Sequence, residues 1–431
     1  MIKNFIASRR KLLAAMTAGA MLTKANISFA SENKEKNIAG LKGKIIGVGS
    51  KQTIMPEELM VDQINLYPET IVNEPSEASN KWPEAGNTPL IILDLETGEV
   101  QHKKINSITS HSLVKIDDSG FACISYSNPL YFLNNSFDVR GKFEIPEGYA
   151  TCGHALHIPG TKFLVTHLNG MNENVGNSYL AIIDTETFQL VKSVKTGIIL
   201  GHDMRLLNDG KHFAVSDDGQ NSEGDKNFTT IPVKPAIYIF SNDNFSLKKI
   251  IDLKVKGAPV HIEQDNSGNF IFTVEQGVKI SKEGLAALEN HLGKARNSPF
   301  LFEDMFANDF YPLPISIHNP ETGRQIDIMK DKMSQFAPFD IRKSEKSGAV
   351  ICSFIKSNKL IKIVDSNATD MASTLDFGVY KPYGLAPIME TDFMAVTSVN
   401  NTIAIFDVRN MKLVKKYDIE TFGMKHMIHV A

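Results

Sequence analysis

The chain has 431 residues, with 46 Lys and Arg against 49 Asp and Glu, and a formal net charge of −3 at pH 7. This balance, without a basic run, argues against nucleic acid and anionic lipid as partners. Three cysteines, Cys123, Cys152 and Cys352, are too few for a disulfide framework. Cys123 and Cys352 lie in apolar runs and are expected to be small buried residues.

The first 30 residues predict an export signal. Arg9 and Arg10 precede a mildly apolar run over residues 12–22, which is too short to span a membrane as a helix of the mature protein. Residues 28–30 are Ser-Phe-Ala, with small residues at the two positions that a signal peptidase recognises, so cleavage is expected after Ala30. The paired arginines favour the twin-arginine route over the general secretory route.

The expected segments are a signal peptide over residues 1–30, a linker over 31–39 and a folded domain over 40–431, located in the periplasm. Cleavage removes five cations and no anions, which leaves 41 basic and 49 acidic side chains and a net charge of −8. No other stretch is long and apolar enough to span a bilayer, so no stable membrane insertion of the mature chain is expected.

The middle of the chain contains one pattern twice. CGHALHIPGTKFLVTHL opens at Cys152, and LGHDMRLLNDGKHFAVSDDG opens at Leu200. Each reads as Gly-His, a short apolar strand, a turn and a second strand, and two further short strands follow. Four short strands repeated at a spacing of some tens of residues predict the blades of a propeller.

Turn and strand signals divide the sequence into seven such units. Six of them open near Ser110, Gly153, Gly201, Val260, Pro338 and Tyr383. The seventh is split, because MKHMIHVA at the C-terminus supplies one strand and KIIGVG from Lys44 begins the others. The sequence therefore predicts an all-β fold, a seven-bladed β-propeller whose ring is closed by the C-terminal strand, which leaves no open sheet edge.

The connections between second and third strands are very unequal in length. Long ones are expected at residues 50–88, 169–178, 217–235 and 276–313, and long connections often carry function. The last contains SKEGLAALENHLGKAR from Ser281, which places three leucines on one helical face. It predicts one short helical insertion, over residues 281–296, at the channel mouth.

Five histidines recur near the start of the innermost strand of a unit: His111, His154, His202, His261 and His426. The two remaining units have no histidine there, and their nearest residues are Phe336, Asp340 and Tyr383. One interpretation is structural: each imidazole hydrogen-bonds neighbouring strands and holds its blade together. The sequence favours this interpretation and leaves two alternatives open.

The first alternative is a transition-metal site. Neutral imidazole is the commonest side-chain ligand for Fe, Cu and Zn, and Asp203 or Asp340 could complete the site. The second alternative is an anionic small-molecule site that uses Arg205. Ligand binding is therefore expected at Arg205, Asp203, Asp340 and Tyr383, and metal binding, where it occurs, at the five histidines.

The stretch from Gly153 to Gln276 resembles a known family. GHALHIPGTKFLVTHLNG, GHDMRLLNDGKHFAVSDDG and VHIEQDNSGNFIFTVEQ are similar to units of the twin-arginine-exported propeller family that accompanies imelysin-type iron-uptake proteins. That family has Gly-His-Gly, Gly-x-His-Glu-Leu and Arg-His-Leu at similar places. Here Ala155 replaces the second glycine, Asp203 stands for Glu, and Val260 precedes the third histidine.

More distantly, the chain is similar to quinoprotein amine dehydrogenase heavy chains and to other propellers of the YVTN and WD40 types. The resemblances imply the fold and a link to metal uptake. The expected function is a monomeric binding or scaffold module, which holds a periplasmic protein or a small ligand at the loop-rich channel face. The alternative is a metal-dependent or quinoprotein-like redox enzyme with a His-lined site, and the sequence leaves open whether the protein is an enzyme.

Replacing Arg9 and Arg10 by Lys is expected to leave the precursor in the cytoplasm of a bacterium, because the twin-arginine route reads the arginine pair itself. Cell fractionation and immunoblotting measure the distribution of precursor and mature protein. A Lys11→Arg variant, which preserves the charge and the pair, serves as the control. Unchanged export of the double variant would indicate the general secretory route instead.

Overall fold

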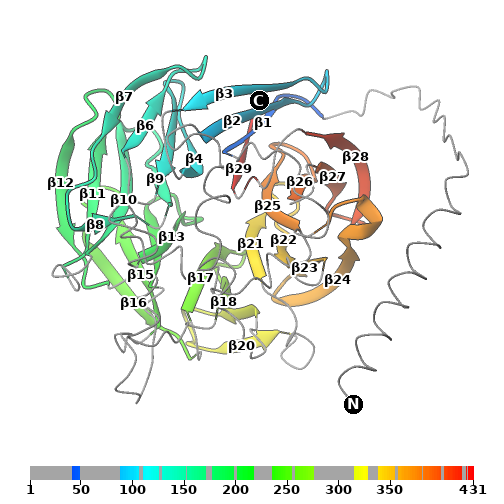
Figure 1. Ribbon diagram of the computed structural model, residues 1–431. Coiled ribbons are helices and arrows are strands. Elements are labelled where there is room, and N and C mark those ends of the chain that lie inside the picture. The colour runs from blue at the N-terminus through cyan, green and yellow to red at the C-terminus, as the bar shows by residue number, and fades with distance from the viewer. Residues whose placement is uncertain are drawn as a thin grey trace, which may run out of the picture. The chain divides into compact units, whose positions relative to one another are not determined.

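The computed structural model describes residues 41–48, 88–105, 110–125, 129–151, 153–170, 177–198, 201–217, 235–254, 258–275, 315–328, 338–354, 358–380, 382–398, 402–419, 424 and 426–431. These residues form seven antiparallel sheets arranged as a ring (Figure 1). The predicted seven-bladed β-propeller is therefore confirmed. Gly40–Ala431 make up one compact unit.

The blades follow one another in chain order around the ring. Blade 1 consists of β29 (Met427–Val430), β1 (Lys44–Val48), β2 (Thr88–Asp94) and β3 (Val100–Ile105). Blade 2 consists of β4 (Ser110–Ile116), β5 (Gly120–Ser125), β6 (Leu130–Leu133) and β7 (Val139–Phe143). Blade 3 consists of β8 (Tyr149–Ala150), β9 (Ala155–His157), β10 (Phe163–Gly170), β11 (Tyr179–Asp184) and β12 (Leu190–Lys195).

The remaining blades each have four strands. Blade 4 consists of β13 (Gly201–Leu206), β14 (His212–Asp217), β15 (Ala236–Ser241) and β16 (Leu247–Asp252). Blade 5 consists of β17 (Ala258–Gln264), β18 (Phe270–Glu275), β19 (Ile315–His318) and β20 (Gln325–Ile328). Blade 6 consists of β21 (Pro338–Lys343), β22 (Val350–Phe354), β23 (Lys359–Val364) and β24 (Asn367–Ser373), and blade 7 of β25 (Pro382–Pro387), β26 (Phe393–Ser398), β27 (Thr402–Asp407) and β28 (Lys412–Asp418).

The C-terminal strand closes the ring as the sequence predicts. β29 pairs with β1 in antiparallel register, with Ile45 opposite His429 and Ile46 opposite Ile428. Between blades 7 and 1, the hydroxyl group of Tyr417 donates a hydrogen bond of 2.8 Å to the carbonyl of Leu95. A side-chain hydrogen bond therefore joins the last blade to the first.

The hydrophobic core lies between neighbouring blades. Ile116 and Phe132 of blade 2 pack in one buried cluster with Leu164 and Ile183 of blade 3. Burial of such a side chain contributes roughly 1.5–3 kcal/mol relative to exposure. Because the apolar residues are used between the sheets, the strand ends at the channel are left for polar side chains.

The turns between third and fourth strands follow the predicted chemistry. The carboxylate oxygen Oδ1 of Asp94 accepts hydrogen bonds from the amides of Glu96 and Thr97, at 3.0 and 2.8 Å. Asp184 makes the same two bonds in blade 3. Such side-chain to backbone bonds define the turn locally, so the repeat can be recognised from sequence.

Several predicted features lie outside the described residues: the signal peptide, the linker, most of the long connections and the helix over residues 281–296. In the described part, the one helical element is the 3₁₀ turn η2 (Thr374–Phe377). No helix in that part is long and apolar enough to cross a membrane. Cys123 and Cys352 are buried free thiols, as predicted, and burial raises the pKa of Cys123 to about 12.

Deleting residues 424–431 is expected to open the ring, because β1 then keeps only β2 as a partner and presents an unpaired edge beside an exposed apolar core. The truncated protein should aggregate or elute as large species in size-exclusion chromatography. Deleting Ala431 alone, which leaves β29 intact, should give a soluble protein with an unchanged melting temperature. A soluble, cooperatively unfolding 424–431 deletion would contradict closure by β29.

Candidate metal centre in the channel

Five imidazoles converge where the inner strands begin. We call His111, His154, His202, His261 and His426 the channel histidine cluster. The ring centroid of His154 lies 5.0 Å from that of His111 and 4.7 Å from that of His426. It also lies 5.2 Å from that of His202 and 5.4 Å from that of His261. His154 therefore contacts every other member of the cluster.

The ring nitrogens form two sets in which one atom from each residue lies within 4.8 Å of the others. One set is His111, His154 and His426, and the other is His154, His202 and His261. Ligands of one tetrahedral ion, each about 2.0–2.1 Å from the metal, are roughly 3.4 Å apart. Modest side-chain rotation would therefore close either set around an ion.

A recurring irregularity in the inner strands positions these residues. The ladder between first and second strands is interrupted at residues 201–204, 259–262 and 338–341, which leaves two residues unpaired in each case. The second unpaired residue donates its amide to a hydroxyl of the next strand: Asp203 to Ser216, His261 to Thr273 and Asp340 to Ser353. His261, Asp203 and Asp340 are thus equivalent, and His202 precedes this position by one residue.

Two glycines allow imidazole rings of neighbouring blades to pack against the inner strands. Gly153, with φ of +81°, lies against the His111 ring, and a Cβ there would collide with it. A Cβ on Gly201 would likewise collide with the ring of His167. The glycine of each Gly-His pair therefore makes room for a histidine of the neighbouring blade.

Two carboxylates lie beside the Nδ1 atoms of the cluster. Nδ1 of His154 is 3.4 Å from Oδ1 of Asp203, and Nδ1 of His426 is 3.5 Å from Oδ2 of Asp340. Nδ1 of His426 is also 3.2 Å from Nη2 of Arg342. A carboxylate only accepts hydrogen bonds, so the contact with Asp203 places the proton of His154 on Nδ1 and the lone pair on Nε2.

The aspartates themselves are fully engaged. Asp203 accepts hydrogen bonds from the amides of Met204 and Ile262, at 2.9 and 3.1 Å, and pairs with Arg205 at 3.0 Å. Ile262 belongs to the next blade, so the carboxylate also ties the two blades together. Asp203 therefore orients an imidazole and does not fit the direct-ligand role considered from sequence.

Asp340 repeats this arrangement one pair of blades further on. It accepts from the amides of Ile341 and Leu385, each at 2.9 Å, and pairs with Arg342 at 2.8 Å. Burial alone would raise the pKa of Asp340, but the neighbouring Arg342 and His426 outweigh it and lower the pKa. Arg342 was not identified from sequence, although the Asp-x-Arg spacing that it shares with Arg205 was available as a signal.

Several cluster nitrogens have no hydrogen-bond partner among the described residues. These atoms are Nε2 of His154, Nε2 of His426 and both ring nitrogens of His261. All three residues are buried, with 5% or less of their surface exposed. A buried polar atom without a partner costs about 1–3 kcal/mol, so such atoms are rare unless a ligand uses them.

Three other buried histidines show the contrasting pattern. His167 contacts Asn169 at 2.8 Å and Thr196 at 3.0 Å, one through each ring nitrogen. His157 contacts the carbonyl of Thr161 and the carboxylate of Asp117. His429 accepts from the amide of Met389 and bonds the carbonyl of Lys42. Both ring nitrogens are therefore occupied in these three histidines, whereas Nδ1 of the buried His318 has no hydrogen-bond partner among the described residues.

Burial keeps three members of the cluster neutral. It lowers the pKa of His154 and of His261 well below the usual value, and the neighbouring imidazoles add to the effect. The pKa of His426 is also lowered by burial, although Asp340 opposes this. Neutral imidazole is the form that binds metals, so these three residues are ready to act as ligands at pH 7.

Blades 6 and 7 contribute aromatic rings where the other blades contribute histidines. Phe339 and Tyr383 stack with centroids 4.1 Å apart, and the Phe339 ring lies 5.9 Å from that of His426. Tyr383 was identified from sequence, whereas Phe339 was missed. Phe336, the residue named instead, lies outside the described residues.

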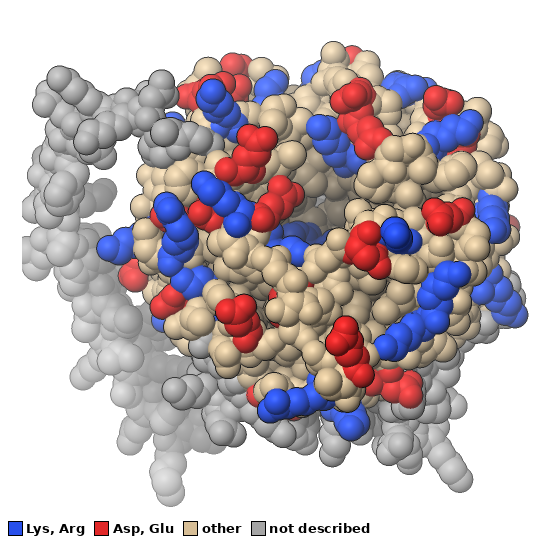
Figure 2. Space-filling view, turned by 180° about the vertical axis from the view of Figure 1, so that it is seen from behind, with Lys and Arg blue, Asp and Glu red and all other residues tan. Residues whose placement is uncertain are grey.

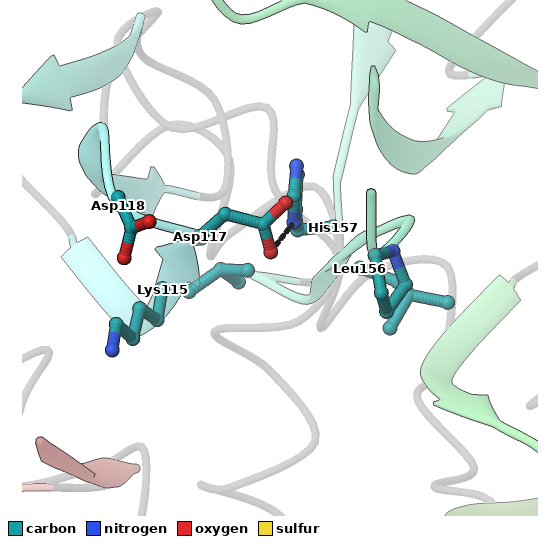
Figure 3. Close-up of a pocket in the computed structure, with 7 residues that line it drawn as sticks. Lys115, Asp117, Asp118, Leu156 and His157 are labelled. Carbon is teal, nitrogen blue, oxygen red and sulfur yellow. Dashed lines mark ion pairs between the residues drawn. The ribbon is translucent and has the colours of Figure 1, made fainter. Parts of the chain in front are cut away.

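Two other polar features lie near the channel. Figure 2 shows acidic and basic side chains interspersed around a central hollow, with Lys or Arg side chains in its depth. A separate cavity of about 540 Å³ is lined by Val114, Lys115, Asp117, Asp118, Leu156, His157 and Pro159 (Figure 3). Both nitrogens of His157, one of its lining residues, are occupied.

No protein-family model matches the sequence, and no curated protein matches it. Among solved structures, a protein from Lactobacillus plantarum is similar with a TM-score of 0.54 and 11% identity, covering 90% of this chain and 100% of that one. Kuenenia stuttgartiensis hydrazine synthase is similar with a TM-score of 0.50 and 12% identity, covering 73% and 88%. At such identities the likeness shows the propeller fold alone.

His167 should make the stability of the protein depend on pH. Burial lowers its pKa to about 4 from a usual value of 6.5. Between these values the unfolded chain binds a proton that the folded chain does not. The free energy of unfolding should therefore fall by roughly 3 kcal/mol from this residue as the pH drops from 7 to 4.

The measurement is urea unfolding of the parent and of a His167→Gln variant at several pH values. Gln cannot titrate but can still contact Asn169 and Thr196, so the variant should lose less stability on acidification. An equal loss of unfolding free energy in both proteins would show that His167 is not the source of this pH dependence.

Proposed function

We propose that this protein is an exported metal-binding propeller, which holds a divalent transition metal ion in the channel histidine cluster. The observation that carries the proposal is the direction of the imidazoles. The Nδ1 atom of His154 lies beside a buried carboxylate, while its Nε2 atom has no hydrogen-bond partner in the described part of the chain and lies among other imidazoles. Histidine ligands of metals typically have this arrangement, with the second nitrogen bonded to a carboxylate.

The purely structural interpretation accounts less well for the cluster. It requires each imidazole to bond strands or loops of its own blade, as His157, His167 and His429 do. Nothing among the described residues pairs with the two nitrogens of His261. A bound cation would satisfy the Nε2 lone pair that the buried, neutral His154 directs at its neighbours, because this atom would become a ligand.

The ligand chemistry favours Cu²⁺ or Zn²⁺. Neither buried aspartate is available as a ligand, since both carboxylates bind amides and guanidinium groups. A site made of imidazole nitrogens suits Zn, Cu, Fe and Ni, whereas Mg²⁺ and Ca²⁺ require oxygen ligands. Among the divalent ions, Cu²⁺ and Zn²⁺ bind such sites more tightly than Fe²⁺ does.

The export signal and the resemblance to the imelysin-associated family support a role in handling this metal in the periplasm. The bound ion could be passed to another protein or to a small ligand. The proposed role is therefore that of a metal-binding module, in line with the binding function expected from the sequence.

The test is the metal content and thermal stability of the purified mature protein, the double variant His154→Ala, His261→Ala and the control His167→Gln. The parent and the control should contain stoichiometric metal by mass spectrometry, and the double variant close to none. After the metal has been removed with a chelator, Zn²⁺ at about 100 times the dissociation constant should stabilise the parent and the control by about 2.7 kcal/mol relative to their metal-free forms and leave the double variant unchanged.

The double variant should remain folded, because it removes buried polar atoms that lack partners and leaves the blade cores intact. Absence of metal from the parent, together with no stabilisation by Zn²⁺ or Cu²⁺, would contradict the proposed function. In that case the five histidines would have a structural role in the channel and would bind no ion.

A further inference from the structure

We infer that the channel histidine cluster offers a single metal ion two alternative positions, which share His154 as a common ligand. This inference rests on the proposed function and specifies how the site would act. Position A is defined by His111, His154 and His426, and position B by His154, His202 and His261.

The geometry of the cluster separates the two positions. The ligand atoms of His111, His154 and His426 lie within 4.8 Å of one another, and so do those of His154, His202 and His261. The rings of His261 and His426 lie beside each other, with centroids 5.2 Å apart. Among the described residues, the closely spaced ligand atoms thus fall into two adjacent sets that share His154.

The chemistry of His154 prevents both positions from being filled together. The contact of its Nδ1 atom with Asp203 places a proton on that nitrogen, so only the Nε2 lone pair can bind a metal. Filling both positions would need an imidazolate and the loss of the Asp203 contact. Two dications so close together in a buried site would also repel each other strongly.

An ion can therefore change position by exchanging two of three ligands while His154 stays bound. Each position supplies three protein nitrogens, which leaves a coordination site open, unlike the closed four-ligand sites that serve a structural role. The arrangement fits capture and handover of a borderline divalent cation, because every intermediate keeps at least one protein ligand and one site for an incoming ligand.

Three variants separate the positions. His111→Ala removes a ligand of position A only, His202→Ala removes a ligand of position B only, and the double variant damages both. Zn²⁺ stoichiometry and affinity are measured by chelator competition, and the Co²⁺ form reports ligand geometry through its visible spectrum. The melting temperatures of the metal-free variants verify that each is folded.

We expect one ion per chain in the parent and in both single variants. Losing one of two comparable positions should weaken Zn²⁺ binding only about twofold to tenfold, with a different Co²⁺ spectrum for each single variant. The double variant should bind about 100-fold more weakly than the parent, more than the product of the single effects, because no intact position remains.

Three results would overturn the inference. Two Zn²⁺ ions per chain in the parent would indicate a dinuclear centre. Single variants that each weaken binding as much as the double variant would indicate one site that needs all its ligands. Effects confined to one single variant would indicate one position only. In these three cases the proposed metal-binding function would stand, whereas a parent that binds no ion would overturn both.

Discussion

Two buried carboxylates, Asp203 and Asp340, determine how the wall of the channel is built. An unpaired charge in such a position would be very costly, so each must be surrounded by donors. Each takes them from an arginine two residues on, from its own blade and from the first strand of the next blade. The same carboxylates touch the Nδ1 atoms of two histidines. Structural cohesion and the orientation of the imidazoles thus depend on the same charges.

The fold could be predicted from sequence because its determinants are local and repeated. Apolar strands, turns such as that at Asp94 and the split first blade are visible in the order of residues. The five histidines could be named for the same reason. Their convergence could not, since it depends on the packing of blades that lie far apart in the chain.

The details of the site depend on irregular backbone that a repeat pattern does not reveal. A two-residue interruption of the ladder places Asp203, and not His202, at the position that His261 occupies in the next blade. The same interruption brings Phe339 to the cluster. Counting residues from one Gly-His pair to the next therefore identifies the correct part of each inner strand. It places some side chains one residue away from the position that they occupy in the structure.

The closing strand also has a consequence for when the cluster can exist. His426 directly precedes β29, the last strand of the chain, and its ring lies 4.5 Å from that of His111 and 4.7 Å from that of His154. During synthesis, blades 2 to 5 can assemble while the C-terminus is still being made, but one of the two ligand sets has no third member until the ring is shut. Closure of the sheet ring and completion of that ligand set are therefore a single event, so a misclosed chain would lack a set of imidazoles that the closed ring brings together.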